Sequence, residues 1–252
     1  KAEGIFANTP NILYRFVADL DYTHYYKVIA TNTETGKTVS ASTQVVDSFA
    51  IIRPDDENVF PQSFTLAPNT LYQVRWRSAQ DAKIYDMTIR FHYREGIYFS
   101  EGDSIHYTYS GYKDWLFETN YEQESTDGGL IITYDIPGES FYAFIKDSFE
   151  PVADNNFVRI ADSIQFFIDA GGEELFNYFE YNNATLGLTE GQISPTYTNV
   201  ENGLGILSSR FHKEGLIYPM AIQTRDSIAC STVTSGLNFA PDGSKESFPY
   251  CD

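Results

Sequence analysis

The sequence predicts a mostly-β protein built from two-layer sandwich domains with short helical insertions. Its 252 residues include 19 Tyr and 19 Phe but only 2 Met, and flat aromatic rings favour strands because they pack well on a pleated sheet. Short segments alternate between apolar and polar residues, as strands with one buried face do. Polar turn sequences separate these segments, and no repeat period indicates a solenoid or a propeller.

The first unit is a hairpin near the N-terminus. Residues His24–Thr31 and Thr38–Val46 alternate on both arms of a turn that contains Gly36, which is the expected hairpin pattern. Residues Ile12–Val17 predict another strand before it. Three strands make only a small sheet, which needs further strands or a neighbour to close a core.

A break in the pattern follows this hairpin. Residues 53–58 are polar and turn-forming, and Pro61 and Pro68 come soon afterwards, so we predict a domain boundary here. We therefore divide the chain into three parts: a small β domain over residues 1–53, a larger sandwich over 54–225 and a C-terminal tail over 226–252. The small domain need not be complete.

Two strands beyond this boundary carry the most informative pattern. Tyr72, Val74 and Trp76 share one face of the first strand, and alternate apolar residues share one face of the strand over 84–93. A buried Trp, a short loop and a long strand led by Tyr85 resemble an immunoglobulin-like or fibronectin type III-like sandwich. That resemblance implies a sandwich for the larger unit.

The remaining segments predict further strands and two helices. The strands are expected over residues 96–100, 104–110, 130–136, 163–170, 205–211 and 216–223. Apolar residues at helical spacing predict a helix over residues 139–149, packed on the sheet, and a second one over 173–181.

The net charge is −18, from 35 acidic and 17 basic residues. Such a field repels a nucleic-acid duplex and an anionic membrane surface, so we expect no nucleic-acid partner. The acidity fits solubility better than a cation-binding surface. No apolar run approaches the roughly 20 residues that span a bilayer. The chain starts at Lys1 in a polar segment, so we expect it to follow a removed leader or to begin partway into a domain.

Cys230 and Cys251 are the only two cysteines. They lie too far apart in sequence for a redox or zinc pair of the CxxC type. A disulfide would close a loop of about 20 residues and stabilise the tail by about 3 kcal/mol, whereas two free thiols are the alternative. We favour the disulfide, and with it an oxidising compartment.

No motif predicts catalysis. The chain lacks the GxSxG, HExxH, P-loop and GxGxxG patterns. His92 and His106 could face each other across a hairpin and bind a transition metal with a nearby acid, but exposed strand histidines are far commoner. We therefore predict no enzyme, no metal site and no cofactor. Paired carboxylates of a glycan hydrolase stay an alternative, because among 35 acids some pair is always close.

A binding surface has the better argument. Tyr107, Tyr109, Tyr112 and Trp115 cluster within residues 106–117. Tyr107 and Tyr109 are expected to point the same way on a strand, and Gly111 to turn the chain. Exposed rings stack on sugars or anchor a protein partner, whereas the commoner alternative is that they fill the core. These four residues form the candidate ligand-binding patch.

Several stretches resemble the uncharacterised lipoproteins of the Bacteroidetes cell envelope. The stretches are YYKV (25–28) with TGKTVSA (35–41), YQVRW (72–76) with FHYRE (91–95) and, most strongly, YTNVENGLGI (197–206). The resemblance implies two β domains, a lipid on a removed N-terminal Cys as the only membrane contact, and an outer-membrane or cell-surface location, with the periplasm as the alternative. It implies no catalytic residues.

A short repeated motif agrees with this resemblance. Asp-Ser-Ile occurs three times and is similar to the O-glycosylation acceptor of exported proteins in that phylum, with Ser104, Ser163 and Ser227 as acceptors. We therefore expect a non-enzymatic envelope lipoprotein that binds a protein or a glycan at the surface, for example as an accessory of an outer-membrane transporter. The alternatives are a glycan-active hydrolase and a structural adhesin or fimbria-like subunit with an edge strand open to donor-strand pairing.

Overall fold

The computed structural model describes residues 14–56, 62–98, 105–123, 125–154, 156–185 and 197–241. It confirms a mostly-β fold, in which two sheets pack over one core. The small sheet has the strand order β3 (Ile51–Arg53), β4 (Leu71–Arg77), β7 (Ile131–Pro137). The large sheet contains β6 (Ile105–Glu122), β5 (Ile84–Tyr98) and β8 (Phe157–Gly171), with β9 (Arg210–Pro219) and β10 (Phe239–Ala240) both paired to β8.

The core forms because the strands of both sheets alternate as the sequence predicts. On β5, every second residue from Tyr85 to Tyr93 is at most 7% exposed, and the residues between them point to the other face. Trp76 on β4 is fully buried, and its ring lies 5.7 Å from that of Tyr85. We call the face of the large sheet that meets this core its inner face, and the opposite one its outer face.

Both predicted helices are present. The first is α1 (Gly138–Ser148), which follows β7 directly. Its Phe141 is fully buried and contacts the rings of Phe91 and Trp115 on the inner face of the large sheet. The second is α2 (Glu173–Thr185), which starts just after β8 and is longer than the predicted 173–181.

The C-terminal part differs from the prediction. The expected strands over 205–211 and 216–223 are a single strand, β9, followed by a third helix, α3 (Ile222–Cys230). The helix buries only Thr224 and Ile228, so its sequence carries almost no apolar periodicity. The helix is held instead by a contact with a segment far away in the sequence: the Thr224 hydroxyl accepts a hydrogen bond from the Leu66 backbone N–H at 2.9 Å.

The strands β5 and β6 are much longer than the short hairpin predicted over 96–100 and 104–110. Gly111, which was expected to turn the chain, lies inside β6 and pairs with Tyr93. A Cβ atom at Gly111 would stand 2.5 Å from the ring of Tyr109. The glycine therefore makes room for an aromatic ring inside a strand, and the turn prediction is wrong.

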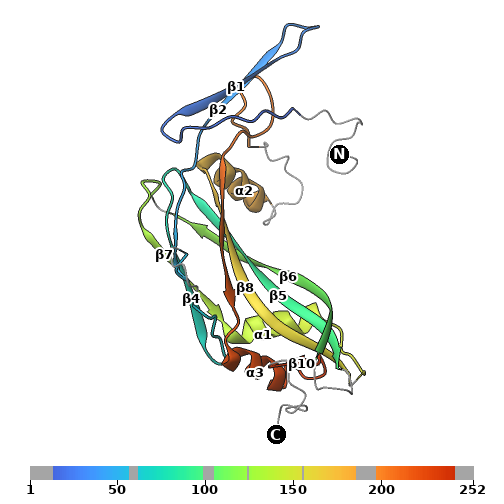
Figure 1. Ribbon diagram of the computed structural model, residues 1–252. Coiled ribbons are helices and arrows are strands. Elements are labelled where there is room, and N and C mark those ends of the chain that lie inside the picture. Colours follow the sequence, from blue (N-terminus) through green and yellow to red (C-terminus); the bar gives the residue numbers. More distant parts are fainter. Residues whose placement is uncertain are drawn as a thin grey trace.

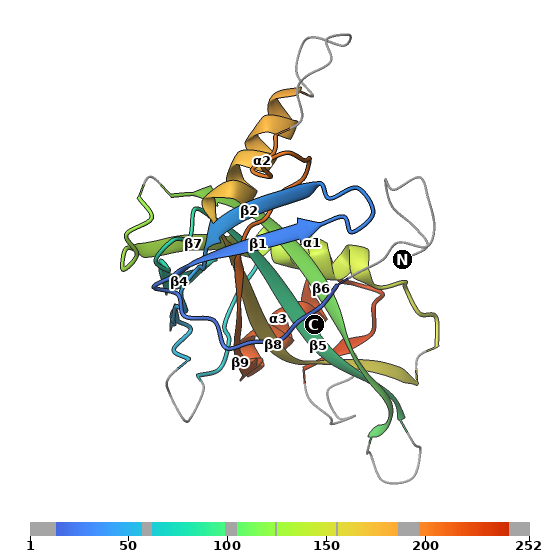
Figure 2. The ribbon, with the colours of Figure 1, turned by 90° about the horizontal axis from the view of Figure 1, so that it is seen from above.

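The N-terminal hairpin is confirmed as β1 (Tyr25–Thr31) and β2 (Thr38–Gln44). It lies at one end of an elongated molecule, whereas α1, α3 and β10 lie at the other (Figure 1). Seen from above, the hairpin crosses over the end of the sandwich beside α2 (Figure 2). Residues 14–17 are not in a strand, contrary to the prediction over Ile12–Val17, and residues 12 and 13 lie outside the described residues.

The core crosses both predicted domain boundaries. Val46, Phe49 and Ile51 precede the boundary at residue 53, yet they belong to the same buried cluster as the strands that follow it. Ile228 and Phe239 of the predicted C-terminal tail are also part of this cluster. The segments before residue 53 and after residue 225 therefore help to close the larger unit.

Candidate functional site: the outer face of the large sheet

The strand alternation that fills the core also places a set of polar and aromatic side chains on the outer face of the large sheet. They come from three strands that are neighbours in the sheet, β6, β5 and β8, and from β9. The register brings Arg90 on β5 opposite Asp114 on β6, and His92 opposite Tyr112. The outer face is therefore built from regular strands, which hold side chains more rigidly than loops do.

One row of planar groups runs across all four strands, and we call it the long row. The Arg90 Cζ atom lies 3.9 Å from the centre of the Tyr112 ring and 4.7 Å from that of Phe167. Phe167 in turn stacks on the His212 ring at 5.7 Å and 20°. Phe167 is only 8% exposed, because its neighbours in the row cover it.

The arginine of the long row is held in place by a carboxylate. Arg90 donates from Nε to Asp114 Oδ1 at 2.7 Å and from Nη2 to Asp114 Oδ2 at 2.8 Å. This two-point geometry fixes the plane of the guanidinium group. The hydrogen bonds to Asp114 also raise the pKa of Arg90 above its ordinary value. The row ends with His212, whose Nδ1 atom lies 2.9 Å from Asp169 Oδ1.

A second, shorter row, which we call the short row, crosses the same sheet four residues further along β5, at Arg94. The Arg94 Cζ atom is 4.4 Å from the centre of the Tyr107 ring, and its Nη2 atom lies 2.8 Å from Asp162 Oδ1. The Asp162 backbone carbonyl accepts a hydrogen bond from Arg225 Nη2 of α3 at 3.3 Å. The short row therefore also combines a ring, an arginine and a carboxylate, but its carboxylate comes from β8, whereas the one that holds Arg90 comes from β6.

A hollow of about 210 Å³ separates the two rows. We call it the slot. It is lined by His92, Tyr93, Arg94, Ser110, Gly111, Tyr112 and Asp162. His92 Nε2 and Arg94 Nε are shielded from solvent and have no hydrogen-bond partner among the described residues. Buried polar atoms of this kind usually have a partner, because leaving one unpaired costs about 1–3 kcal/mol.

The four residues of the predicted aromatic patch do not form one surface. Tyr107 and Tyr112 lie on the outer face, in the two rows. Tyr109 contacts Tyr93 at the margin of the inner face, although it is 52% exposed. Trp115 packs into the core, where its ring stacks on Phe144 at 5.2 Å and 9°.

The prediction that Tyr107 and Tyr109 point the same way is therefore wrong. The reason is a bulge in β6: Tyr109 pairs with Glu95 and Tyr107 with the next residue, Gly96, so Thr108 has no partner in the register. An extra residue of this kind reverses the alternation of the strand. Tyr107 thereby joins the outer face and Tyr109 does not.

The charged residues of the site are not among those that the sequence predicts. Arg90, His92 and Arg94 alternate with the buried residues of β5. The same alternation that revealed the core therefore placed three nitrogen-bearing side chains on the other face. Asp162 could not be found in this way, because it reaches the site from another strand.

The remaining predicted site residues have mixed outcomes. Cys230 is disulfide-bonded, but Cys251 lies outside the described residues, so the pairing stays a prediction. Ser163 is only 6% exposed between β5 and β9, so little of it is accessible in the folded chain, and its role as a glycan acceptor stays a prediction. Ser227 is half-buried and donates its hydroxyl to the Gln223 carbonyl at 2.8 Å. Ser104 lies outside the described residues.

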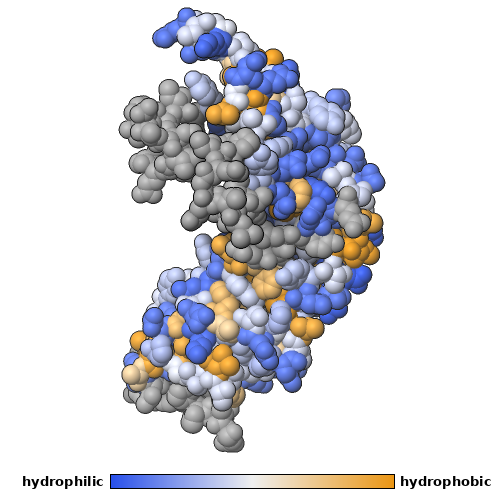
Figure 3. Space-filling view, turned by 180° about the vertical axis from the view of Figure 1, so that it is seen from behind, coloured by the Kyte–Doolittle hydropathy of each residue, from blue (hydrophilic) through white to orange (hydrophobic). Residues whose placement is uncertain are grey.

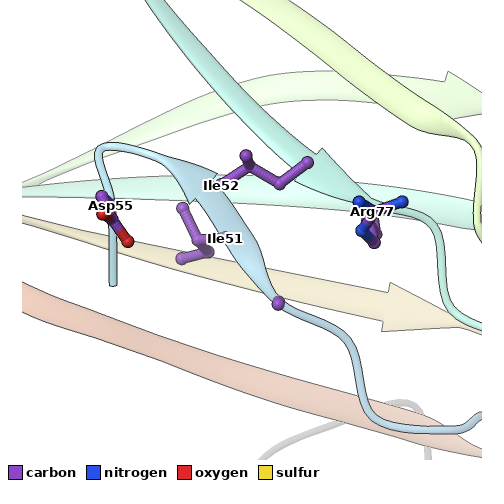
Figure 4. A pocket seen from close by; sticks show the side chains of 5 residues that line it. Ile51, Ile52, Asp55 and Arg77 are labelled. Carbon is purple, nitrogen blue, oxygen red and sulfur yellow. The ribbon is translucent and has the colours of Figure 1, made fainter. Parts of the chain in front are cut away.

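Other hollows have fewer converging polar groups. One of about 250 Å³ is lined by Ala50, Ile51, Ile52, Asp55 and Arg77, and its two charged residues lie on either side of the isoleucines (Figure 4). Another, of about 290 Å³, is mainly apolar and lies between the β1–β2 hairpin and residues 200–207. The view from behind shows small apolar patches separated by hydrophilic residues (Figure 3). The slot is therefore the best candidate for a specific site.

Neither a metal cluster nor a membrane helix is found in the part of the chain that the structure describes. Within those ranges, no three His, Cys, Asp or Glu residues come together as metal ligands would. None of the described helices has the length and apolar character that a bilayer crossing requires.

Comparisons with known proteins give little. No family model and no curated protein sequence matches the chain. Among solved structures, the sporulation control protein Spo0M from Bacillus subtilis is similar over 72% of this chain and 51% of its own, with 8% identity and a TM-score of 0.19. A similarity this low carries no argument about fold or function.

Proposed function

We propose that this chain is a non-enzymatic binding module of a cell-envelope lipoprotein, and that it binds a surface glycan through the outer face of the large sheet. The proposal includes export to the outer membrane or cell surface, as the resemblance to Bacteroidetes lipoproteins implies. It also includes an immunoglobulin-like or fibronectin type III-like type of β-sandwich. The disulfide at Cys230 supports an oxidising compartment.

The observation that carries the binding function is the long row. Its Arg90 guanidinium lies over the Tyr112 and Phe167 rings and is held in place by two hydrogen bonds to Asp114. A surface that is already rigid loses little conformational freedom when a ligand binds. Tyr112 is nevertheless 53% exposed, so part of its ring is available to the apolar face of a sugar.

Glycan recognition fits this surface better than catalysis does. The carboxylates of Asp114 and Asp162 are each engaged with an arginine, and that of Asp169 lies beside a histidine. A glycosidase needs two carboxyl groups that converge on one bond, one of them protonated. Each of these carboxylates is oriented by its own cationic or imidazole partner, which supports a binding role for this face.

The test is a glycan microarray probed with the whole chain and with two variants. Tyr112→Ala removes the exposed ring of the long row, and we expect roughly tenfold weaker binding, the usual loss for an aromatic anchor. Tyr25→Ala is the matched control, since Tyr25 is a 77% exposed tyrosine on β1 at the other end of the molecule. Equal binding by both variants, or binding of no glycan by the whole chain, would count against the proposal.

A strand-adding adhesin is the second candidate, and one observation favours it. In the described residues, β1 pairs only with β2, and Tyr25 and Ile29 are 77% and 62% exposed. A free edge of this kind can accept a strand from a partner. Proline at Ile29 would block such pairing, so an assembly that survives Ile29→Pro in a folded chain argues against this candidate.

A further inference from the structure

We infer that the slot holds one neutral sugar ring, which it recognises through two neighbouring hydroxyl groups. This inference rests on the proposed glycan-binding function and names the ligand chemistry of the same face. It follows from the size of the slot, from the hydrogen-bonding groups in its walls and from the balance of charge around it.

The size of the slot fits a single ring. Its volume is about 210 Å³, which is below the roughly 300–1,000 Å³ of pockets that enclose drug-sized ligands. The walls come from β5, β6 and β8, which lie side by side in the sheet. Tyr112 lines the slot together with the ion-paired Arg94 and Asp162, so a sugar ring in the slot meets both an aromatic and a charged side chain.

The hydrogen-bonding groups of the slot match a pair of hydroxyls. Asp162 Oδ1 is paired with Arg94 Nη2 at 2.8 Å, and a carboxylate has about four hydrogen-bond acceptor positions in all. It can therefore accept two further hydrogen bonds from adjacent hydroxyl groups. Each hydroxyl can in turn accept a hydrogen bond, and Arg94 Nε needs an acceptor while His92 Nε2 needs a partner of either kind.

The charges favour a neutral ligand over an acidic one. The two arginines of the rows are already paired, Arg90 with Asp114 and Arg94 with Asp162. The whole chain carries a net charge of −18, which repels a uronate, sulfate or phosphate group. An unmodified hexose has no charge and presents the hydroxyl pairs that Asp162 and Arg94 can bind.

The test uses calorimetry of the whole chain with methyl mannoside, methyl glucoside and glucuronate as probes. For a single ring we expect a Kd on the order of 1 mM for at least one neutral glycoside, and weaker binding of glucuronate. Asp162→Asn keeps the shape of the side chain but removes its charge, and it should weaken binding about tenfold. Asp135→Asn is the control, because Asp135 is an exposed aspartate on β7 of the small sheet that accepts a side-chain hydrogen bond from Gln73 and does not line the slot.

A second readout does not depend on any variant. Titration of the neutral glycoside into the wild-type chain should shift the NMR signals of the His92 ring, because His92 lines the slot that the sugar would occupy. Glucuronate binding more tightly than the glucoside, or Asp162→Asn and Asp135→Asn having equal effects, would overturn the inference. If the array shows Tyr112-dependent glycan binding while Asp162→Asn binds normally, only the slot assignment fails. If no glycan binds at all, the proposed function fails with it.

Discussion

Arg159 offers a sharp test of how one end of the large sheet is held together. It lies on β8 and is 7% exposed. Its Nε atom donates to Glu95 Oε1 at 2.9 Å, and its Nη1 atom donates to the backbone carbonyls of Glu150 and Leu237 at 3.1 and 2.9 Å. One side chain thus ties β8 to β5, to the segment after α1 and to the segment before β10.

The substitution Arg159→Met keeps much of the apolar stem but removes the charge and its hydrogen bonds. Removing one partner of a buried ion pair costs about 3–5 kcal/mol, because the other charge is left unpaired. The Glu95 side chain is 21% exposed, so water relieves part of this cost and we expect a loss of about 3 kcal/mol. That is a large share of the roughly 5–15 kcal/mol that stabilises a typical domain.

The assay is urea unfolding followed by tryptophan fluorescence, which reports on the core because Trp76 is fully buried. The midpoint should fall without a change in the slope of the transition. Lys27→Met is the control, since the Lys27–Glu201 pair is 3.8 Å long and both side chains are more than half exposed; it should cost less than about 0.5 kcal/mol. A loss below about 1 kcal/mol for Arg159→Met would refute the reasoning.

Three further predictions concern the core, the tyrosines and the disulfide. Phe166→Ala should destabilise the chain by about 3–5 kcal/mol in the same urea assay, because Phe166 is fully buried and contacts the rings of Tyr72 and Tyr218; a loss under about 1.5 kcal/mol would contradict this packing. Burial raises the pKa of Tyr72, Tyr93 and Tyr142 from 10.0 to about 12, so stability should be unaffected below pH 10 and fall as the pH rises from 10 to 12, where the unfolded chain ionises first. Tyrosinate absorbance should then show a class of tyrosines that ionises only as the chain unfolds, and ionisation of all tyrosines near pH 10 in a folded chain would argue against it. Reduction of the Cys230 disulfide should lower the unfolding free energy by about 2–4 kcal/mol, and peptide mapping without reductant should link Cys230 to Cys251, whereas a mixed disulfide with another thiol would disprove that pairing.

The parts of the fold that the sequence predicts are those with a strong local period. The alternation along β5 located the core face from Tyr85 to Tyr93, and the spacing of Phe141 and Ile145 located α1. Trp76 was expected to be buried, and it is. In each case the buried residues of one element repeat often enough to stand out from the polar residues between them.

The parts that were missed depend on contacts between distant segments. The bulge at Thr108 is set by the pairing of β6 with β5, and it reverses the faces of Tyr107 and Tyr109. Arg94 and Asp162 meet only because β5 and β8 are neighbours in the sheet. A pattern within one strand shows which face a residue takes, but it does not show which residue of another strand will lie beside it.

The central claim is that ligands meet this protein on the outer face of the large sheet. NMR chemical-shift mapping with a glycan that binds on the array tests it most directly, because it locates the contact without any substitution. The claim predicts that the largest shifts fall on Tyr107, Tyr112, Arg90 and Arg94. Shifts confined to the β1–β2 hairpin, with the outer face unchanged, would contradict it.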